Sequence, residues 1–172
     1  MLKAIGYNPY KIHQPNIDEK ILYKESPKNY VSRLSEEKAR SAISLQNNSY
    51  ILGADTAIFY GAQIIGKPKN YDDAYNILNN LSGKRHRVFG GICLISPNQK
   101  VIKRVIVTRV KFRFISKKEI LDYLITNEWK DKAGGYAIQG YAAKFVQHIS
   151  GNYDNVKGLS LVDFDSMMRG IN

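Results

Sequence analysis

Residues 85–114, RHRVFGGICLISPNQKVIKRVIVTRVKFRF, contain two β-rich runs separated by the turn residues Pro97, Asn98 and Gln99. Two such runs joined by a short turn are typical of a β-hairpin, and a hairpin pairs its strands antiparallel. A sheet built around this hairpin cannot be purely parallel.

Helix signals lie on both sides of the hairpin. Ser26 followed by Pro27 is typical of an N-cap and a first helical residue, and the apolar spacing after it predicts a helix to about Gln46. A second helix is predicted from Asn70 to Ser82-Gly83, and the capping box Ser116–Glu119 opens a third.

Shorter segments complete the predicted order of elements. Strands are predicted at Tyr7–His13, Tyr50–Phe59 and Phe145–Ile149, and a last helix near Leu159. Because strands and helices alternate around an antiparallel hairpin, the sequence predicts an α/β fold with a mixed, twisted β-sheet flanked by helices.

The bulk properties fit one cytoplasmic domain. A chain of 172 residues is the usual size of one domain, and its single cysteine, Cys93, lies in an apolar run typical of a core. No apolar run reaches the roughly 20 residues of a membrane span, and Met1–Gly6 is too short and polar for a signal peptide. A cytoplasmic location is therefore predicted.

The chain is strongly basic, with 26 Lys and Arg against 15 Asp and Glu and a net charge of +11. Such a charge suits nucleic acid, an anionic membrane or a polyphosphate ligand. The lysines are spread along the chain, and no recognised nucleic-acid reader motif accompanies them, so codon bias is the alternative explanation. Nucleic acid is therefore not the expected partner.

The first of three polar islands is Gly53-Ala54-Asp55-Thr56, inside an apolar run. A buried carboxylate is costly unless something pairs with it. A cation, a metal or a catalytic role would each explain Asp55. The alternative is a structural hydrogen bond at a strand end.

Two further islands contain glycine. Gly66-Lys67-Pro68 presents a lysine that could neutralise a phosphate, although an ordinary surface turn has the same composition. Residues 131–140, DKAGGYAIQG, group small residues around Lys132 and Gln139, and a Gln amide can donate to and accept from a base edge. Their glycine spacing matches neither a P-loop nor a dinucleotide fingerprint.

These islands occur in a fixed order with further short motifs. The motifs are Gly53-Ala54-Asp55-Thr56, Gly66-Lys67-Pro68, Leu81-Ser82-Gly83 with His86, Asp131-Lys132-Ala133-Gly134, Tyr136, Ile138-Gln139-Gly140, and Gly151, Tyr153, Val156 and Gly158-Leu159. Together they resemble the Maf family of nucleoside triphosphate pyrophosphatases over nearly the whole chain.

The resemblance implies a nucleotide cleft of the Maf and inosine triphosphate pyrophosphatase type. It also implies hydrolysis of a nucleoside triphosphate between the α- and β-phosphates, with a divalent cation, Mg²⁺ or Mn²⁺, as cofactor.

Residue roles follow from the same resemblance. Asp55 corresponds to the proton acceptor that activates water, and Lys38 and Lys67 to the family's two functional lysines. Asp18 corresponds to an acidic substrate-binding residue with Glu19 adjacent, and the metal ligands are left open among Asp18, Glu19 and Asp55. Thr56 and Gln139 resemble the subgroup that acts on dTTP and UTP, and Lys132 is a further expected substrate contact.

The opening of the chain departs from the family pattern. Family members begin with a strand and a loop resembling Leu-Ala-Ser-x-Ser-Pro-Arg-Arg, whereas Met1–Gly6 resembles only the end of the following helix. The expectation is a single domain, residues 1–172, that lacks this strand and loop, has an unpaired sheet edge and has reduced activity. The open edge also favours a homodimer. The alternatives to an active enzyme are a catalytically dead nucleotide-binding protein of the same fold and, less favoured, a basic nucleic-acid-binding module suggested by the net charge alone.

Overall fold

The computed structural model describes residues 1–45 and 48–171 and contains a five-stranded sheet of order β2-β1-β3-β4-β5. The strands are β1 (Ile51–Tyr60), β2 (Gln63–Ile65), β3 (Arg85–Ile95), β4 (Val101–Phe112) and β5 (Val146–Ser150). The α-helices are α1 (Pro27–Arg40), α2 (Tyr71–Leu81), α3 (Lys117–Ile125), α4 (Tyr153–Val156) and α5 (Leu161–Gly170). Short 3-10 helices cover Leu2–Ile5, Ile43–Leu45, Ala133–Gly135 and Tyr141–Phe145.

The predicted hairpin is the centre of the sheet. β3 and β4 pair antiparallel from Arg85 opposite Lys111 to Ile95 opposite Val101, and β1 pairs with the other edge of β3. The α/β class with a sheet flanked by helices is thereby confirmed.

All the strand pairings in the described part of the chain are antiparallel, which corrects the expected mixed sheet. The helix α2 connects β2 to β3, and these strands run in the same direction. However, β1 lies between them, so this crossover creates no parallel pair.

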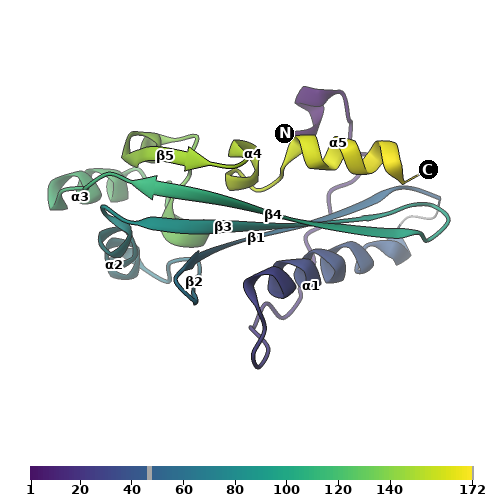
Figure 1. Cartoon of the computed structure of the whole chain (residues 1–172), viewed down its shortest axis with the longest axis horizontal. Coiled ribbons are helices and arrows are strands. Elements are labelled where there is room, and N and C mark those ends of the chain that lie inside the picture. The colour runs from purple at the N-terminus through teal and green to yellow at the C-terminus, as the bar shows by residue number, and fades with distance from the viewer. Residues whose placement is uncertain (46–47, 172) are drawn as a thin grey trace.

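Helices cover both faces of the long strands (Figure 1). The helix α1 lies on one face and packs its Tyr30, Val31 and Leu34 against alternate residues of β1 and β3. On the other face, α5 packs at one end of the strands, and α2 and α3 pack at the other end. Cys93 is fully buried in this sheet, as predicted.

Most helix boundaries follow the predicted caps. The Ser26 hydroxyl accepts a hydrogen bond from the Asn29 amide at 3.2 Å, and the Ser116–Glu119 capping box is complete. The helix α1 ends at Arg40, however, and not near Gln46, which lies outside the described residues. A turn and a 3-10 helix replace its expected last part, because the chain must turn back there to enter β1.

Residues Tyr7–His13 form no strand, contrary to the prediction. The segment pairs with no described strand and covers no sheet face, so most of its residues are exposed. Correspondingly, β2 pairs only with Ile58–Tyr60, and no described strand covers the Ile51–Ala57 edge of β1. The expected open edge is therefore present in the part of the chain that the structure describes.

His86 lies in the core, on the face that α2 and α3 cover. Its side chain is within 2.7 Å of the Tyr136 hydroxyl through Nε2, and the residue is only 2% exposed. Burial lowers the pKa of His86 to about 4, because the charged imidazolium would lose its hydration. His86, one of the motif residues, is therefore a neutral core residue at physiological pH.

We expect His86 to make the protein less stable in mild acid. Its pKa in the folded state lies below the ordinary value of about 6.5, so the unfolded chain binds the proton first as pH falls. The stability contribution is thus present above about pH 6.5 and is lost as pH falls toward 4. Between pH 7 and pH 5 the free energy of unfolding should fall by on the order of 2 kcal/mol from this group.

Urea unfolding of the wild type and His86→Gln at both pH values measures this contribution. In His86→Gln, most of the expected fall in the free energy of unfolding between pH 7 and pH 5 should be absent. The control variant His148→Gln, changed at an exposed position, should still show that fall. Equal pH dependence in the wild type and His86→Gln would contradict the assignment.

Candidate active site

The centre of the candidate site is a carboxylate, an ammonium group and a second carboxylate in contact. Lys38 Nζ lies 2.5 Å from Asp55 Oδ1 and 2.8 Å from Glu19 Oε1. The Asp55 side chain is 7% exposed, that of Lys38 is 21% exposed and that of Glu19 is 44% exposed. The group therefore runs from the sheet interior to the surface.

Glycines determine how closely α1 approaches the sheet. A Cβ atom at Gly53 would lie 2.1 Å from the Ser35 carbonyl oxygen, and one at Gly91 would lie 2.1 Å from the Val31 carbonyl oxygen. Only a residue without a side chain permits this backbone contact. The close approach brings Lys38 of α1 over Asp55, which is two residues beyond Gly53 on the same face of β1.

The electrostatics of the pair suit a proton acceptor. Burial raises the pKa of Asp55 above its ordinary value, and the Lys38 ammonium offsets only part of this effect. For Lys38, burial acts to lower the pKa, but the carboxylates of Asp55 and Glu19 together raise it. A carboxylate with a raised pKa is a stronger base than one in water, while Lys38 keeps it close to a fixed positive charge.

A tyrosine supports the outer carboxylate. The Tyr30 hydroxyl donates a hydrogen bond to the Glu19 carbonyl oxygen at 2.8 Å and thereby fixes the backbone of Glu19 to α1. Burial raises the pKa of Tyr30 to about 12, and the charges of Asp55 and Glu19 add to the effect, so the hydroxyl keeps its proton. Sequence reasoning missed this role, because Tyr30 looks like any apolar residue of the helix stripe.

The second and third polar islands meet in the structure. The Gly134 amide donates to the Gly66 carbonyl oxygen at 2.9 Å, next to Lys67. Lys67 is close enough to Asp55 for its charge to lower the pKa of that carboxyl, although less than Lys38 does. The two islands and the β1 carboxylate therefore lie in one region of the molecule.

Other predicted site residues are not brought to Asp55. Thr56 points to the opposite face of β1, where its hydroxyl donates to the Gly158 carbonyl oxygen at 3.2 Å. Asp18 is exposed and pairs with Lys20 at 3.5 Å. Gln139 and Lys132 are exposed, and no hydrogen bond or ion pair within residues 1–45 and 48–171 joins them to Asp55. A direct substrate contact by these four residues stays a prediction, and for Thr56 the geometry favours a structural role.

The acidic residues of the site include two carboxylates placed to bind a divalent cation. No group of three or more His, Cys, Asp or Glu side chains suited to a metal occurs among the described residues. Asp55 and Glu19 nevertheless both contact one ammonium group, Lys38 Nζ, so two hard oxygen ligands converge on one cationic position. Such a pair fits Mg²⁺ or Mn²⁺, which commonly bind one or two carboxylates together with substrate phosphates.

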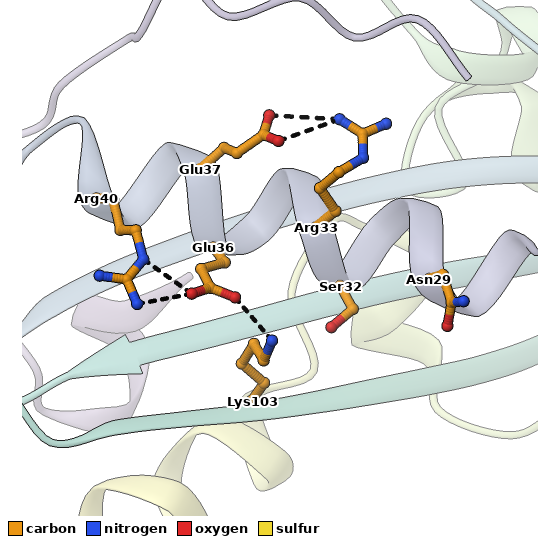
Figure 2. A pocket seen from close by; sticks show the side chains of 7 residues that line it. All are labelled: Asn29, Ser32, Arg33, Glu36, Glu37, Arg40 and Lys103. Carbon is orange, nitrogen blue, oxygen red and sulfur yellow. Dashed lines mark hydrogen bonds and ion pairs between the residues drawn. The ribbon is translucent and has the colours of Figure 1, made fainter. Parts of the chain in front are cut away.

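Two hollows lie near α1. One, of about 550 Å³, follows the open edge of β1 and reaches Lys38, Gly53 and Ala54. The other, of about 400 Å³, lies on the outer side of α1 beside β4 and is lined by residues such as Arg33, Glu36 and Lys103 (Figure 2). The second contains none of the predicted site residues, whereas Lys38 lines the first. The first hollow therefore adjoins the candidate site through Lys38, although Asp55, Glu19 and Lys67 do not line it.

Comparison with known proteins identifies the family of the chain. The family model of the Maf-like proteins matches residues 1–171. The dTTP/UTP pyrophosphatase of Mesorhizobium japonicum is 42% identical over 176 residues, which cover 99% of this chain and 85% of that protein. The nucleoside triphosphate pyrophosphatase of Ehrlichia ruminantium is 42% identical over 168 residues, covering 98% of this chain and 88% of the relative. The chain therefore belongs to the Maf-like protein family.

A third relative has a similar level of identity. The nucleoside triphosphate pyrophosphatase of Anaplasma marginale (strain Florida) is 40% identical over 161 residues, covering 94% of this chain and 82% of that protein. Among the described residues, no helix has both the length and the apolar character needed to cross a membrane.

Proposed function

We propose that this protein is a nucleoside triphosphate pyrophosphatase that hydrolyses dTTP and UTP to the monophosphate and pyrophosphate. The observation that carries the proposal is the contact of Lys38 with both Asp55 and Glu19 inside a member of the Maf-like family. Relatives at about 40% identity bear the names dTTP/UTP pyrophosphatase and nucleoside triphosphate pyrophosphatase.

The proposed chemistry assigns one task to each residue. Asp55 accepts a proton from a water molecule, and the oxygen of that water attacks the α-phosphorus. The bond from the α-phosphorus to the bridging α–β oxygen then breaks. The departing oxygen carries the electron pair away with pyrophosphate. Lys38 and Lys67 supply positive charge near the phosphate oxygens, where negative charge is concentrated in the transition state.

A divalent cation belongs to this proposal. Glu19 and Asp55 would hold Mg²⁺ or Mn²⁺ together with phosphate oxygens, and Lys38 would then move toward the substrate. The cation would supply charge neutralisation on the triphosphate.

Product analysis tests the reaction. Purified protein with Mg²⁺ or Mn²⁺ should convert dTTP or UTP to the monophosphate and pyrophosphate in equal amounts, measured by anion-exchange chromatography. Release of a nucleoside diphosphate with inorganic phosphate would contradict α–β cleavage. Tight nucleotide binding without turnover would support the alternative of a catalytically dead nucleotide-binding protein.

The cellular setting and the oligomeric state also stay proposals. A cytoplasmic location would give the protein access to nucleoside triphosphates. A homodimer would use the open Ile51–Ala57 edge of β1, because an unpaired strand edge is a ready surface for pairing with a second chain.

A further inference from the structure

Four cationic side chains lie together on the α1 face of the sheet, further along the strands than the candidate active site. Arg85 and Arg87 of β3 stand directly opposite Lys111 and Arg109 of β4. We call Arg85, Arg87, Arg109 and Lys111 the basic quartet. In the next strand, His148 of β5 is in register with Lys111.

The face that carries the quartet is open. Arg85 and Arg109 are exposed, whereas their neighbours on the other face, His86 and Val110, are buried. On the quartet's face, the apolar cluster beneath α1 ends on β3 at Phe89, which lies two residues after Arg87 in the sequence. The quartet thus begins where the cover of α1 ends.

No carboxylate neutralises the quartet within the described part of the chain. Its members form no ion pair there, and Arg87 instead donates a hydrogen bond to the Gly61 carbonyl oxygen. A cation further along the same face of β4 behaves differently: Lys103, six residues before Arg109, pairs with Glu36 at 2.7 Å (Figure 2). Ion pairing is therefore available on this face but is absent at the quartet.

Two like-charged pairs opposite one another are unfavourable in a sheet. Directly opposite residues of an antiparallel pair have Cβ atoms about 5 Å apart, so Arg85 repels Lys111 and Arg87 repels Arg109. An anionic ligand would remove this repulsion. The arrangement is two rows of charge, with about 7 Å between successive members of each row, which suits a chain of phosphates better than a single small anion.

We propose that the basic quartet binds the phosphate backbone of single-stranded nucleic acid without reading its sequence. Phosphate contacts carry no base information, so a surface of four cations binds without reading sequence. The quartet itself has no aromatic side chain for base stacking, so its binding rests on charge and should be strongly salt-dependent. This explains why the sequence has no reader motif although its net charge is +11. The neighbouring exposed residues of β5, His148 and Ser150, are polar.

The quartet lies on the same face of the sheet as Asp55 but does not contact it. Asp55 stands opposite Gly91 of β3, and Arg87 lies four residues further along that strand, about 13 Å away. The proposal rests on the charges of the quartet and not on the chemistry of Asp55. It takes up the nucleic-acid-binding alternative that the net charge raised.

Fluorescence anisotropy with a labelled 20-nucleotide single-stranded RNA tests the proposal. The wild type should bind at 50 mM salt with a Kd on the order of 10⁻⁵ M, and log K should fall with log salt concentration with a slope of about −3, since each phosphate contact contributes about −0.7. The triple variant Arg85→Gln, Arg109→Gln, Lys111→Gln should bind at least tenfold more weakly, with a slope of about −1.

A variant with the same charge change elsewhere is the matched control. Lys3, Lys117 and Lys130 are exposed and lie outside the sheet, and replacing all three with Gln should weaken binding by less than threefold. Both triple variants should melt no lower than the wild type, and Arg109→Gln alone provides a milder test. An equal loss in the control, or a wild-type Kd above 1 mM at 50 mM salt, would overturn the proposal.

Two further measurements exclude other uses of the same charges. The first is a sedimentation assay with vesicles that contain phosphatidylglycerol. If the wild type bound these vesicles through the quartet but did not bind RNA through it, the proposal would be overturned in favour of a membrane surface. The value of kcat/KM for dTTP should be unchanged in the quartet variant. A parallel loss of kcat/KM without RNA binding would instead assign the quartet to attraction of the nucleotide substrate, and would also overturn the proposal.

Discussion

The Asp55→Asn variant is expected to lower kcat for dTTP by on the order of 10²–10⁴, the usual contribution of a general base. An Asn side chain has nearly the same shape and still offers an oxygen to Lys38, but it cannot accept a proton at neutral pH. Lys38 and Lys67 remain in the variant, so KM should change by only a few fold.

The pH profile gives this prediction a second readout. Asp55 must be ionised to accept a proton, so wild-type activity should decline as pH falls through the raised pKa of its carboxyl. This acid limb should be lost from the residual activity of Asp55→Asn. The variant should not be less stable at neutral pH, because the ionised carboxylate with a raised pKa makes folding less favourable there.

A surface carboxylate provides the control. Asp122 pairs with Lys118 on α3 at 2.8 Å, away from β1, and Asp122→Asn should leave kcat unchanged. Retention of more than a tenth of wild-type kcat by Asp55→Asn would remove Asp55 from the catalytic role.

The sequence predicted those parts of the fold that depend on local signals. The hairpin of β3 and β4, the Ser26 cap and the Ser116–Glu119 capping box all rest on residues within a few positions of one another. The end of α1 and the absence of a strand at Tyr7–His13 depend on tertiary packing. Local periodicity therefore gave no warning of either outcome.

The candidate site shows the same division. Asp55 was identified from sequence because a polar residue in an apolar run needs a partner, and the structure provides Lys38. The opposite direction of Thr56 follows from the two-residue period of a strand, since neighbours on β1 cannot face the same side. The family resemblance grouped Asp55 and Thr56 by their adjacency in sequence, and adjacency in a strand separates their side chains in space.

The Gly53→Ala variant is expected to lose both stability and activity. The added Cβ would lie 2.1 Å from the Ser35 carbonyl oxygen, 2.6 Å from the Ala39 amide nitrogen and 2.8 Å from the Ala39 Cβ. Two of these atoms belong to the backbone of α1, so no side-chain rotation can relieve the overlap. The helix must move away from β1, and the free energy of unfolding should fall by about 3 kcal/mol or more.

Movement of α1 should also disturb the site, because this helix carries Lys38 and its Tyr30 holds Glu19. A displacement of about 1 Å at a catalytic group can reduce the rate by about 10². We therefore expect kcat of the folded variant to fall at least tenfold, measured at a temperature well below its melting point, with unfolding followed by circular dichroism.

Gly170→Ala is the matched control for Gly53→Ala. Gly170 is the last residue of α5, and a Cβ there would have no atom within 4 Å, so the change should be neutral or slightly stabilising. If Gly53→Ala melted like the wild type, the close contact between α1 and β1 would be wrong. If the variant were destabilised but kept full kcat, then the placement of Lys38 by this contact would not matter for the chemistry, and Asp55 would need another partner during turnover.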